Sequence, residues 1–244
     1  MRKKVRFGIG GIFALMGLGI LVGGLRFLML PSTLPIRQVK VVGDYRFVDA
    51  SQLQLALMPY VSQGFFGLKV RAAERAILAL PGIEEVSVRR IFPGTLSIRV
   101  LEKTPEAFLP DGEIYATDGT AFLPLRAFPS KDLPVFAGSL QDLPSIASFY
   151  QEAKPLLEQD GLHLNYVACD GLGSWTLGTR EGMTVMLGRT DLLARLHRLT
   201  DNYGILEKIN QNQIPTRVDL RYNLGFSAAY AEPTRGSGSH SAVS

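Results

Sequence analysis

The 244-residue sequence is poor in the side chains that enzymes and metal sites use most often. It contains one cysteine, one tryptophan and three histidines. Cys169 cannot form an intrachain disulfide, and we expect it to be a buried, small apolar residue. No HExxH helix, cysteine pair or phosphate-binding glycine loop occurs outside residues 7–25. The sequence therefore predicts no enzyme, no catalytic residue, no metal, no cofactor and no small-molecule substrate.

An excess of charge of one sign is also missing once the first six residues are set aside. The net charge of +4 comes from Arg2, Lys3, Lys4 and Arg6, because the remaining 22 lysines and arginines face 22 aspartates and glutamates. A surface that binds nucleic acid needs a basic excess to neutralise phosphates. The composition therefore predicts no nucleic-acid partner.

The sequence does contain a 19-residue uncharged run, residues 7–25, directly after these cations. As a helix the run spans roughly 28 Å, close to the hydrocarbon thickness of a bilayer. The alternative is a cleaved secretory signal, whose apolar stretch is shorter and ends at a small-x-small site that is missing after Leu25. The pattern predicts one transmembrane helix over residues 7–30, with residues 1–6 cytoplasmic and the rest of the chain exported.

After a linker at residues 31–35, residues 36–104 form a regular series of strand and helix patterns. Alternating valines predict a strand around residues 39–41, and the series ends in two strands around residues 86–88 and 96–100. Between them lie two helices, one from Asp49 to about Pro59 and one from Val70 to Leu80. The order β-α-α-β-β predicts a two-layer α+β unit with both helices on one face of a three-stranded sheet.

Residues 105–232 have the pattern of a mainly antiparallel β domain with two helices, followed by a flexible tail at residues 233–244. Two Asp-Gly pairs, at residues 111–112 and 118–119, are typical of hairpin turns and bracket a short strand. A leucine stripe at helical spacing follows Asp191 and indicates core packing. Strands are expected over residues 113–117, 175–177, 184–187 and 217–226, and helices over residues 144–158 and from Asp191 onward.

The last of these strands, Arg217 to Phe226, alternates strictly between apolar and polar residues, which predicts a half-buried strand. Because it precedes the tail, it could lie at the edge of a sheet with unpaired backbone groups that an extended partner segment could bond. The alternative is a strand in the interior of the sheet, and the alternation fits both positions.

Three segments, together with the predicted anchor, resemble one known family. They are residues 80–96, which include Val86-Ser87-Val88-Arg89-Arg90, residues 183–189, and Val218-Asp219-Leu220-Arg221-Tyr222. In content and order they are similar to the POTRA domain and the β domain of the FtsQ/DivIB family of bacterial cell division proteins. The resemblance covers nearly all of residues 1–230, and it implies a POTRA domain at residues 36–104 and a β domain at residues 105–232.

The resemblance also implies a function, a location and partners. Members of the family are non-enzymatic scaffolds of the divisome, which recruit and link division proteins at the septum and help to control septal wall synthesis. They are single-pass proteins of the inner membrane, with a cytoplasmic N-terminus and a periplasmic bulk. The implied partners are FtsB, which is coiled to FtsL, and also FtsK and FtsW/FtsI-type proteins.

In the family, the terminal strand pairs with an extended segment of FtsB, and the second strand of the POTRA domain takes part in recruitment. The implied partner-binding residues are Arg221, Tyr222, Asn223, Leu224, Gly225 and Phe226, and the implied recruitment residues are Val88 and Arg90. An alternative is a POTRA-containing component of envelope transport or outer-membrane biogenesis. Such proteins carry several POTRA units in tandem, whereas this sequence contains one.

Overall fold

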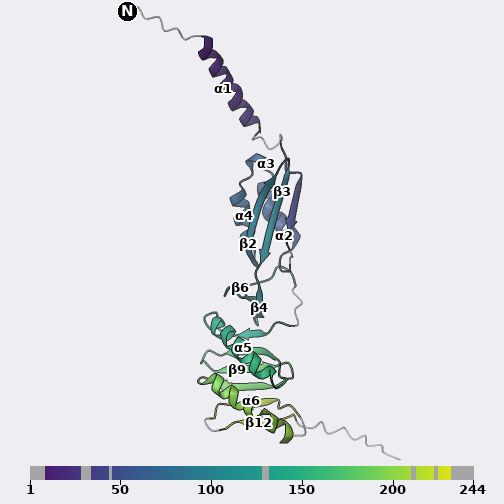
Figure 1. The fold of residues 1–244 in the computed structure, drawn as a ribbon, viewed down its shortest axis with the longest axis vertical. Helices are drawn as coiled ribbons and strands as arrows, with labels where there is room; N and C mark the ends of the chain where they lie inside the picture. Colours follow the sequence, from purple (N-terminus) through teal and green to yellow (C-terminus); the bar gives the residue numbers. More distant parts are fainter. Residues whose placement is uncertain are drawn as a thin grey trace, which may run out of the picture. The chain divides into compact units, whose positions relative to one another are not determined.

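The computed structural model describes residues 9–28, 34–43, 46–127, 132–209, 213–222 and 225–231. The backbone divides into two compact units, one of residues 1–103 and 122–129 and the other of residues 104–121 and 130–244. Each unit has its own hydrophobic core. Figure 1 colours the elements of both units in the order of the sequence.

The first element is α1 (Ile9–Leu28), whose described apolar side chains are exposed, among them Leu15, Ile20 and Leu21. Among the helices of the described ranges, none combines the length and the hydropathy needed to pass through a bilayer. The transmembrane helix predicted over residues 7–30 begins and ends outside the described residues, as does the predicted cytoplasmic segment. The membrane anchor is therefore not confirmed and stays a prediction.

The first unit continues with a three-stranded sheet and helices on one of its faces, as Figure 1 shows. Its sheet order is β1-β3-β2, with β1 parallel and β2 antiparallel to β3. The predicted β-α-α-β-β order is confirmed, with one additional helical turn, α3. Leu53 and Leu57 from α2 and Ile77 from α4 pack against Leu96 and Ile98 of β3. The elements are β1 (Gln38–Val42), α2 (Ala50–Val61), α3 (Gly64–Gly67), α4 (Val70–Leu78), β2 (Ile83–Ile91) and β3 (Thr95–Glu102).

The start and end of α2 differ in detail from the prediction. Asp49 occupies the N-cap position, but its carboxylate accepts a bond from the Ser51 hydroxyl at 2.9 Å instead of capping a backbone amide. The helix also continues past Pro59 to Val61. The segment before α2 is held from afar, because the Glu102 carboxylate accepts the backbone N–H groups of residues 46, 47 and 48 at 2.6 to 3.0 Å.

The second unit contains a mixed sheet of order β12-β11-β10-β9-β8-β7-β4-β5-β6. Three neighbouring pairs are parallel: β4 with β7, β7 with β8, and β10 with β11. The pairings of β9 with β10, β11 with β12, β4 with β5 and β8 with β9 are antiparallel, as expected. The elements are β4 (Pro105–Phe108), β5 (Ile114–Ala116), β6 (Ala121–Phe122), β7 (Val135–Ala137), α5 (Leu143–Glu158), β8 (Leu164–Cys169), β9 (Trp175–Thr179), β10 (Thr184–Gly188), α6 (Leu192–Ile209), β11 (Arg217–Asp219) and β12 (Ser227–Ala229).

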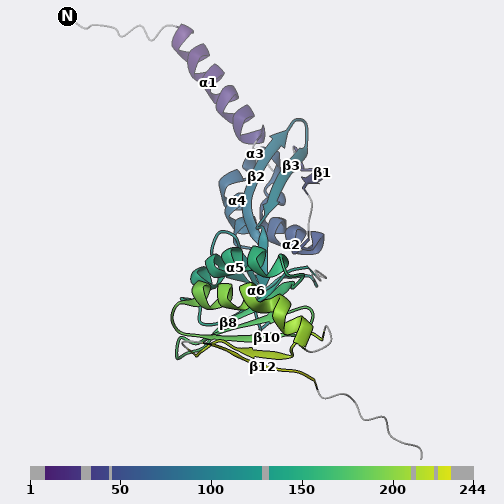
Figure 2. The ribbon, with the colours of Figure 1, turned by 60° about the horizontal axis from the view of Figure 1, so that its bottom comes forward.

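Both helices of this unit, α5 and α6, lie on one face of the sheet, as Figure 2 shows. Ile146 and Leu157 of α5 and Leu196 of α6 are fully buried against strand residues such as Val167 and Leu177. The leucine stripe predicted on the second helix is therefore core packing, as expected. Cys169 is buried in the same core, and it lies on β8, a strand that the sequence analysis missed.

Of the terminal strand predicted from Arg217 to Phe226, the described part forms β11 at its start, and a second strand, β12, begins just after the predicted range, at Ser227. β11 ends at Asp219 and lies in the sheet interior, with β10 on one side and β12 on the other. The edge position predicted for this strand was therefore wrong, and the interior alternative is right for β11. The strand ends at Asp219 although the apolar and polar residues keep alternating beyond it. The Asp219 carboxylate accepts the backbone N–H of Arg221 at 3.1 Å, and this local bond competes with continued strand pairing.

Candidate functional site

The edge of the second unit is formed by β12 rather than by the predicted strand. β12 pairs antiparallel with β11 through Ser227, Ala228 and Ala229, and among the described residues no strand lies on its other side. Ser227 and Ala229 are exposed, whereas Ala228 packs against the core. Such an edge presents backbone N–H and C=O groups to a second chain, and small side chains leave those groups accessible.

The register of β12 is fixed by bonds from outside the strand. The backbone N–H and the hydroxyl of Thr216 both donate to the carbonyl of Ala229, at 2.9 and 3.1 Å. The Tyr230 hydroxyl donates to the carbonyl of Leu206 on α6 at 3.2 Å. These contacts hold the edge strand against both the sheet and the helix.

The turn between β11 and β12 is held by α6. Nη1 of Arg198 donates to the carbonyls of Tyr222 and Gly225, at 2.8 and 3.2 Å. The Tyr222 side chain is 58% exposed, whereas Phe226 packs against the core. Of the predicted binding residues, Tyr222 is therefore open to a partner and Phe226 is largely part of the fold. Asn223 and Leu224 lie outside the described residues.

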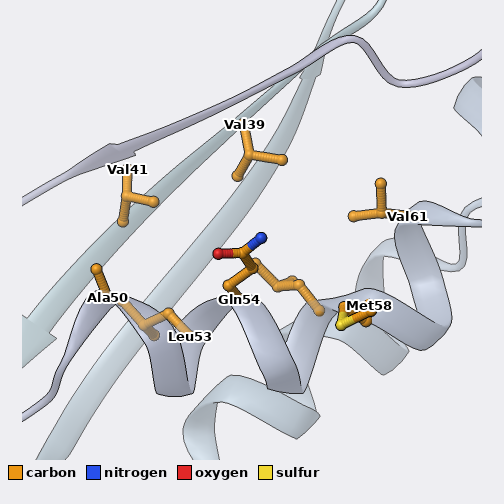
Figure 3. A pocket seen from close by; sticks show the side chains of 8 residues that line it. Val39, Val41, Ala50, Leu53, Gln54, Met58 and Val61 are labelled. Carbon is orange, nitrogen blue, oxygen red and sulfur yellow. The ribbon is translucent and has the colours of Figure 1, made fainter.

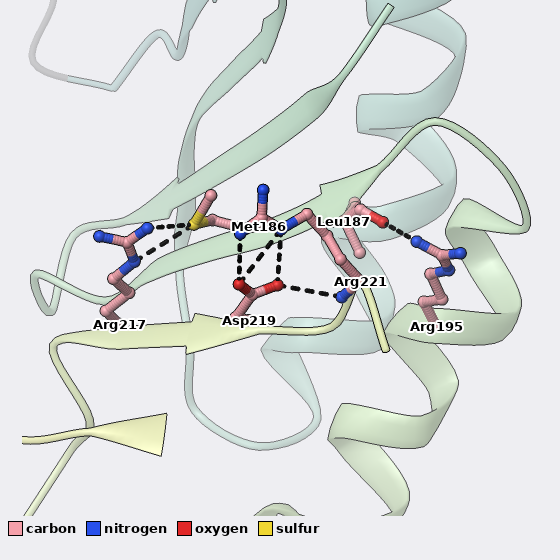
Figure 4. A network of polar contacts seen from close by, with 6 residues as sticks. All are labelled: Met186, Leu187, Arg195, Arg217, Asp219 and Arg221. Carbon is pink, nitrogen blue, oxygen red and sulfur yellow. Dashed lines mark hydrogen bonds and ion pairs between the residues drawn. The ribbon is translucent and has the colours of Figure 1, made fainter. Parts of the chain in front are cut away.

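Arg221 forms an ion pair within its own chain, as Figure 4 shows. Its Nε lies 2.9 and 3.1 Å from the two oxygens of Asp219, and its Nη2 lies 2.7 Å from Oδ2. The bonds from Arg221 lower the pKa of Asp219, and the carboxylate in turn raises the pKa of the guanidinium. The pair orients Arg221, whose side chain remains half exposed.

Two further arginines fix the neighbouring strands, and Figure 4 shows both. Arg217 directs its guanidinium at the sulfur of Met186, at 2.7 and 3.2 Å. Arg195 on α6 donates to the carbonyl of Leu187 at 2.6 Å. β10 is thus bonded by the side chains of Arg195 and Arg217. The alternation of apolar residues in the sequence does not predict these contacts.

The two residues predicted for recruitment in the first unit differ in accessibility. Val88 is 4% exposed, and its backbone N–H donates to the carboxylate of Glu74 on α4 at 2.9 Å. Arg90 is exposed, and its Nη1 donates to the carbonyl of Phe65 on α3 at 3.0 Å. The Val88 side chain therefore belongs to the core, and only Arg90 offers a side chain to a partner.

The first unit also has an apolar groove of about 450 Å³ between β1 and α2, shown in Figure 3. Val39 and Val41 line it from the strand, and Leu53, Gln54 and Met58 line it from the helix. Its lining contains no ionisable side chain. In the described part of the chain, no three His, Cys, Asp or Glu residues are arranged to hold a metal ion. The groove suits an apolar binding partner better than acid–base chemistry.

The architecture of a β-α-α-β-β unit followed by a mixed sheet with an open edge defines a POTRA-containing protein with a separate β domain. Residues 34–103 match the family model described as POTRA domain, FtsQ-type. Residues 111–221 match that of cell division protein FtsQ/DivIB, C-terminal. The chain belongs to the FtsQ/DivIB family of cell division proteins.

Similar curated proteins carry the name cell division protein FtsQ. The protein from Xanthomonas campestris pv. campestris is 31% identical over 79% of this chain and 69% of its own length. That from Allochromatium vinosum is 30% identical, over 91% of this chain and 90% of the relative. That from Coxiella burnetii is 27% identical over 92% of both chains. These relatives do not favour the transport alternative.

Proposed function

We propose that this chain is a non-catalytic scaffold of the divisome, and that β12 accepts an extended segment of a partner protein as an additional strand. The single observation that carries the proposal is that β12 has a neighbour, β11, on one side only among the described residues. Strand addition supplies affinity through backbone bonds and specificity through side chains. The partner we propose is FtsB, together with FtsL, recruited to the septum to control septal wall synthesis.

The residues around β12 are suited to this mode of binding. Tyr222 has an exposed aromatic ring and lies between β11 and β12 in the sequence, and aromatic residues are common anchors of interfaces. Arg221 is oriented by Asp219, yet five N–H groups on a guanidinium leave donors for a second carboxylate. Ser227 and Ala229 do not obstruct the approach of a second backbone. An extended segment with an acidic residue would match these features.

We also propose that the chain spans the inner membrane once near its start, with both units in the periplasm. The uncharged run at residues 7–25, the four cations before it and the exposed apolar side chains of α1 support this placement. FtsK and FtsW/FtsI-type proteins are further candidate partners. A contact near β2 would use Arg90 and the backbone of the strand, because the Val88 side chain is buried.

The docking proposal is tested by replacing Tyr222 with alanine in the full chain. If Tyr222 is a hot spot, binding to the extracytoplasmic FtsB–FtsL pair should weaken by about 2 kcal/mol, or roughly 30-fold in Kd. Tyr166→Ala is the matched control, because Tyr166 is also partly exposed but lies on β8. Titration calorimetry that gives the same affinity for wild type and Tyr222→Ala would reject the assignment.

A depletion experiment separates the scaffold function from the transport alternative. Cells that lose a division scaffold should form long, undivided filaments, and Tyr222→Ala should restore division less well than Tyr166→Ala. Normal division together with altered outer-membrane protein content would contradict the proposed function.

A further inference from the structure

The first unit has an open strand edge of its own, at β1. β1 pairs with β3 through all five of its residues, and in the described ranges no strand lies on its other side. The apolar groove runs beside this edge. Figure 3 shows Val39 and Val41 directed from β1 toward α2, with the Gln54 side chain between strand and helix. A free backbone edge and a groove therefore occur together.

The groove has a buried apolar floor and an exposed apolar rim. Leu53 and Leu57 are at most 2% exposed, whereas Val39 is 39% and Met58 is 59% exposed. The Gln54 amide forms no side-chain hydrogen bond among the described residues, so it can bond the backbone of a ligand. Apolar side chains that entered the groove would remove exposed apolar surface from water.

The other face of the same sheet carries three exposed cations, beside the exposed apolar side chains of Val42 and Leu101. In the strand register, Lys40 lies opposite Ser97, which lies opposite Arg89, and Arg99 lies opposite Val42. Residues opposite one another share a face of the sheet, and positions two apart along a strand share it too. Lys40, Arg89 and Arg99 are all exposed, and within the described residues none of them forms a side-chain hydrogen bond or an ion pair.

One carboxylate shares this face, that of Glu85, near the start of β2. It lies opposite Leu101 on β2, the strand that also carries Arg89 and that β3 separates from β1. A strand that added to β1 would direct every second side chain to this face, beside Gln38, Lys40 or Val42 of β1, with Arg99 on the next strand, β3. Acidic side chains of the added strand would be attracted to the cations on this face. Its apolar side chains, which point the other way, would enter the groove.

We propose that the edge of β1 is a second docking site, which binds an extended segment of another protein with apolar residues alternating with Asp or Glu. The apolar side chains would fill the groove, and an acidic one would lie beside Lys40, on the face that also carries Arg99. A helix is a poorer match, because its backbone groups are already bonded and cannot pair with the strand edge. This site is separate from β12 and does not depend on the partner proposed there.

Met58 and Leu55 provide a matched pair of variants. Both lie on α2 and are similarly exposed, at 59% and 61%, but only Met58 lines the groove. A phage library of random ten-residue peptides is selected on the full-length Leu55→Glu chain and depleted on the full-length Met58→Glu chain. The proposal expects surviving peptides in which apolar and acidic residues alternate. Failure to enrich peptides, or enriched peptides without this alternation, would overturn it.

Two further measurements use a peptide that survives the selection. Its affinity, followed by fluorescence anisotropy, should fall by about fivefold for Lys40→Glu, as expected for one surface charge. Replacing its acidic residues with lysine should restore binding to Lys40→Glu. Equal affinity for wild type, Lys40→Glu and Met58→Glu would place the peptide elsewhere and reject the site. Unchanged binding to Tyr222→Ala would show that the peptide does not occupy β12.

Discussion

Replacing Arg198 with methionine tests whether α6 prepares the docking edge for its partner. Nη1 of Arg198 bonds two carbonyls, those of Tyr222 and Gly225, in the turn that leads into β12. Methionine keeps an unbranched apolar side chain and a similar helix propensity, so the change mainly removes these bonds. Hydrogen bonds to charged groups contribute about 1.5–3 kcal/mol each, but one Nη1 serves both carbonyls at a partly exposed site. We expect the loss of the two hydrogen bonds together to lower the free energy of unfolding by about 1–2 kcal/mol.

A similar free-energy cost should appear as weaker binding of the partner. In the wild-type chain Arg198 already holds the carbonyls of Tyr222 and Gly225, whereas in Arg198→Met the partner would have to fix these groups on binding. A cost of about 1–2 kcal/mol corresponds to roughly a 5- to 30-fold weaker Kd. The exchange of backbone amide hydrogens in residues 227–229 should also become faster in the free variant, because the edge strand loses support.

Arg195→Met is the matched control for this experiment. Arg195 precedes Arg198 by about one turn of α6 and also donates to a backbone carbonyl, that of Leu187 at the end of β10. Both variants should lose similar stability in urea unfolding, but only Arg198→Met should lose affinity for FtsB–FtsL in titration calorimetry. Equal affinities for the two variants would refute the idea that Arg198 positions the edge.

Three further predictions follow from single residues. Because Arg221 lowers the pKa of Asp219, their pair stabilises the fold above the ordinary pKa of about 4 and this contribution is lost at lower pH. The Tm of wild type should therefore fall more steeply than that of Asp219→Asn between about pH 5 and pH 2, and parallel curves would contradict the pair. Burial raises the pKa of the Cys169 thiol, so a maleimide should label it far more slowly in the folded chain than in urea, and equal rates would contradict its burial. Gly188 has a φ of +82°, and a Cβ there would lie 2.7 Å from Nη1 of Arg195. Gly188→Ala should therefore lower the free energy of unfolding by about 1–2 kcal/mol. An unchanged midpoint of urea unfolding would disprove this.

The first unit could be predicted well from the sequence because local pattern and tertiary structure agree there. Alternating valines formed β1, and the apolar positions around Ala73 and Ile77 formed the buried face of α4. The details that were missed depend on distant groups. Glu102 binds three amides of the segment before α2, more than 50 residues earlier in the chain, and no local pattern indicates such a bond.

The docking edge could be predicted only in its approximate position. The alternation of Val218, Leu220 and Tyr222 suggested one continuous strand, yet Tyr222 is exposed and the strand ends at Asp219. Arg198 on α6 and the carboxylate of Asp219 bond backbone groups that a continuing strand would have paired. The short β12, made of serine and two alanines, has too little apolar character to stand out in the sequence.

The parallel pairing of β10 with β11 makes the edge strand depend on elements that precede it in the sequence. β12 pairs with β11, and the crossover that brings β11 to β10 contains α6. A polypeptide still emerging from the ribosome, or one cut before residue 227, would lack the surface proposed for recruitment.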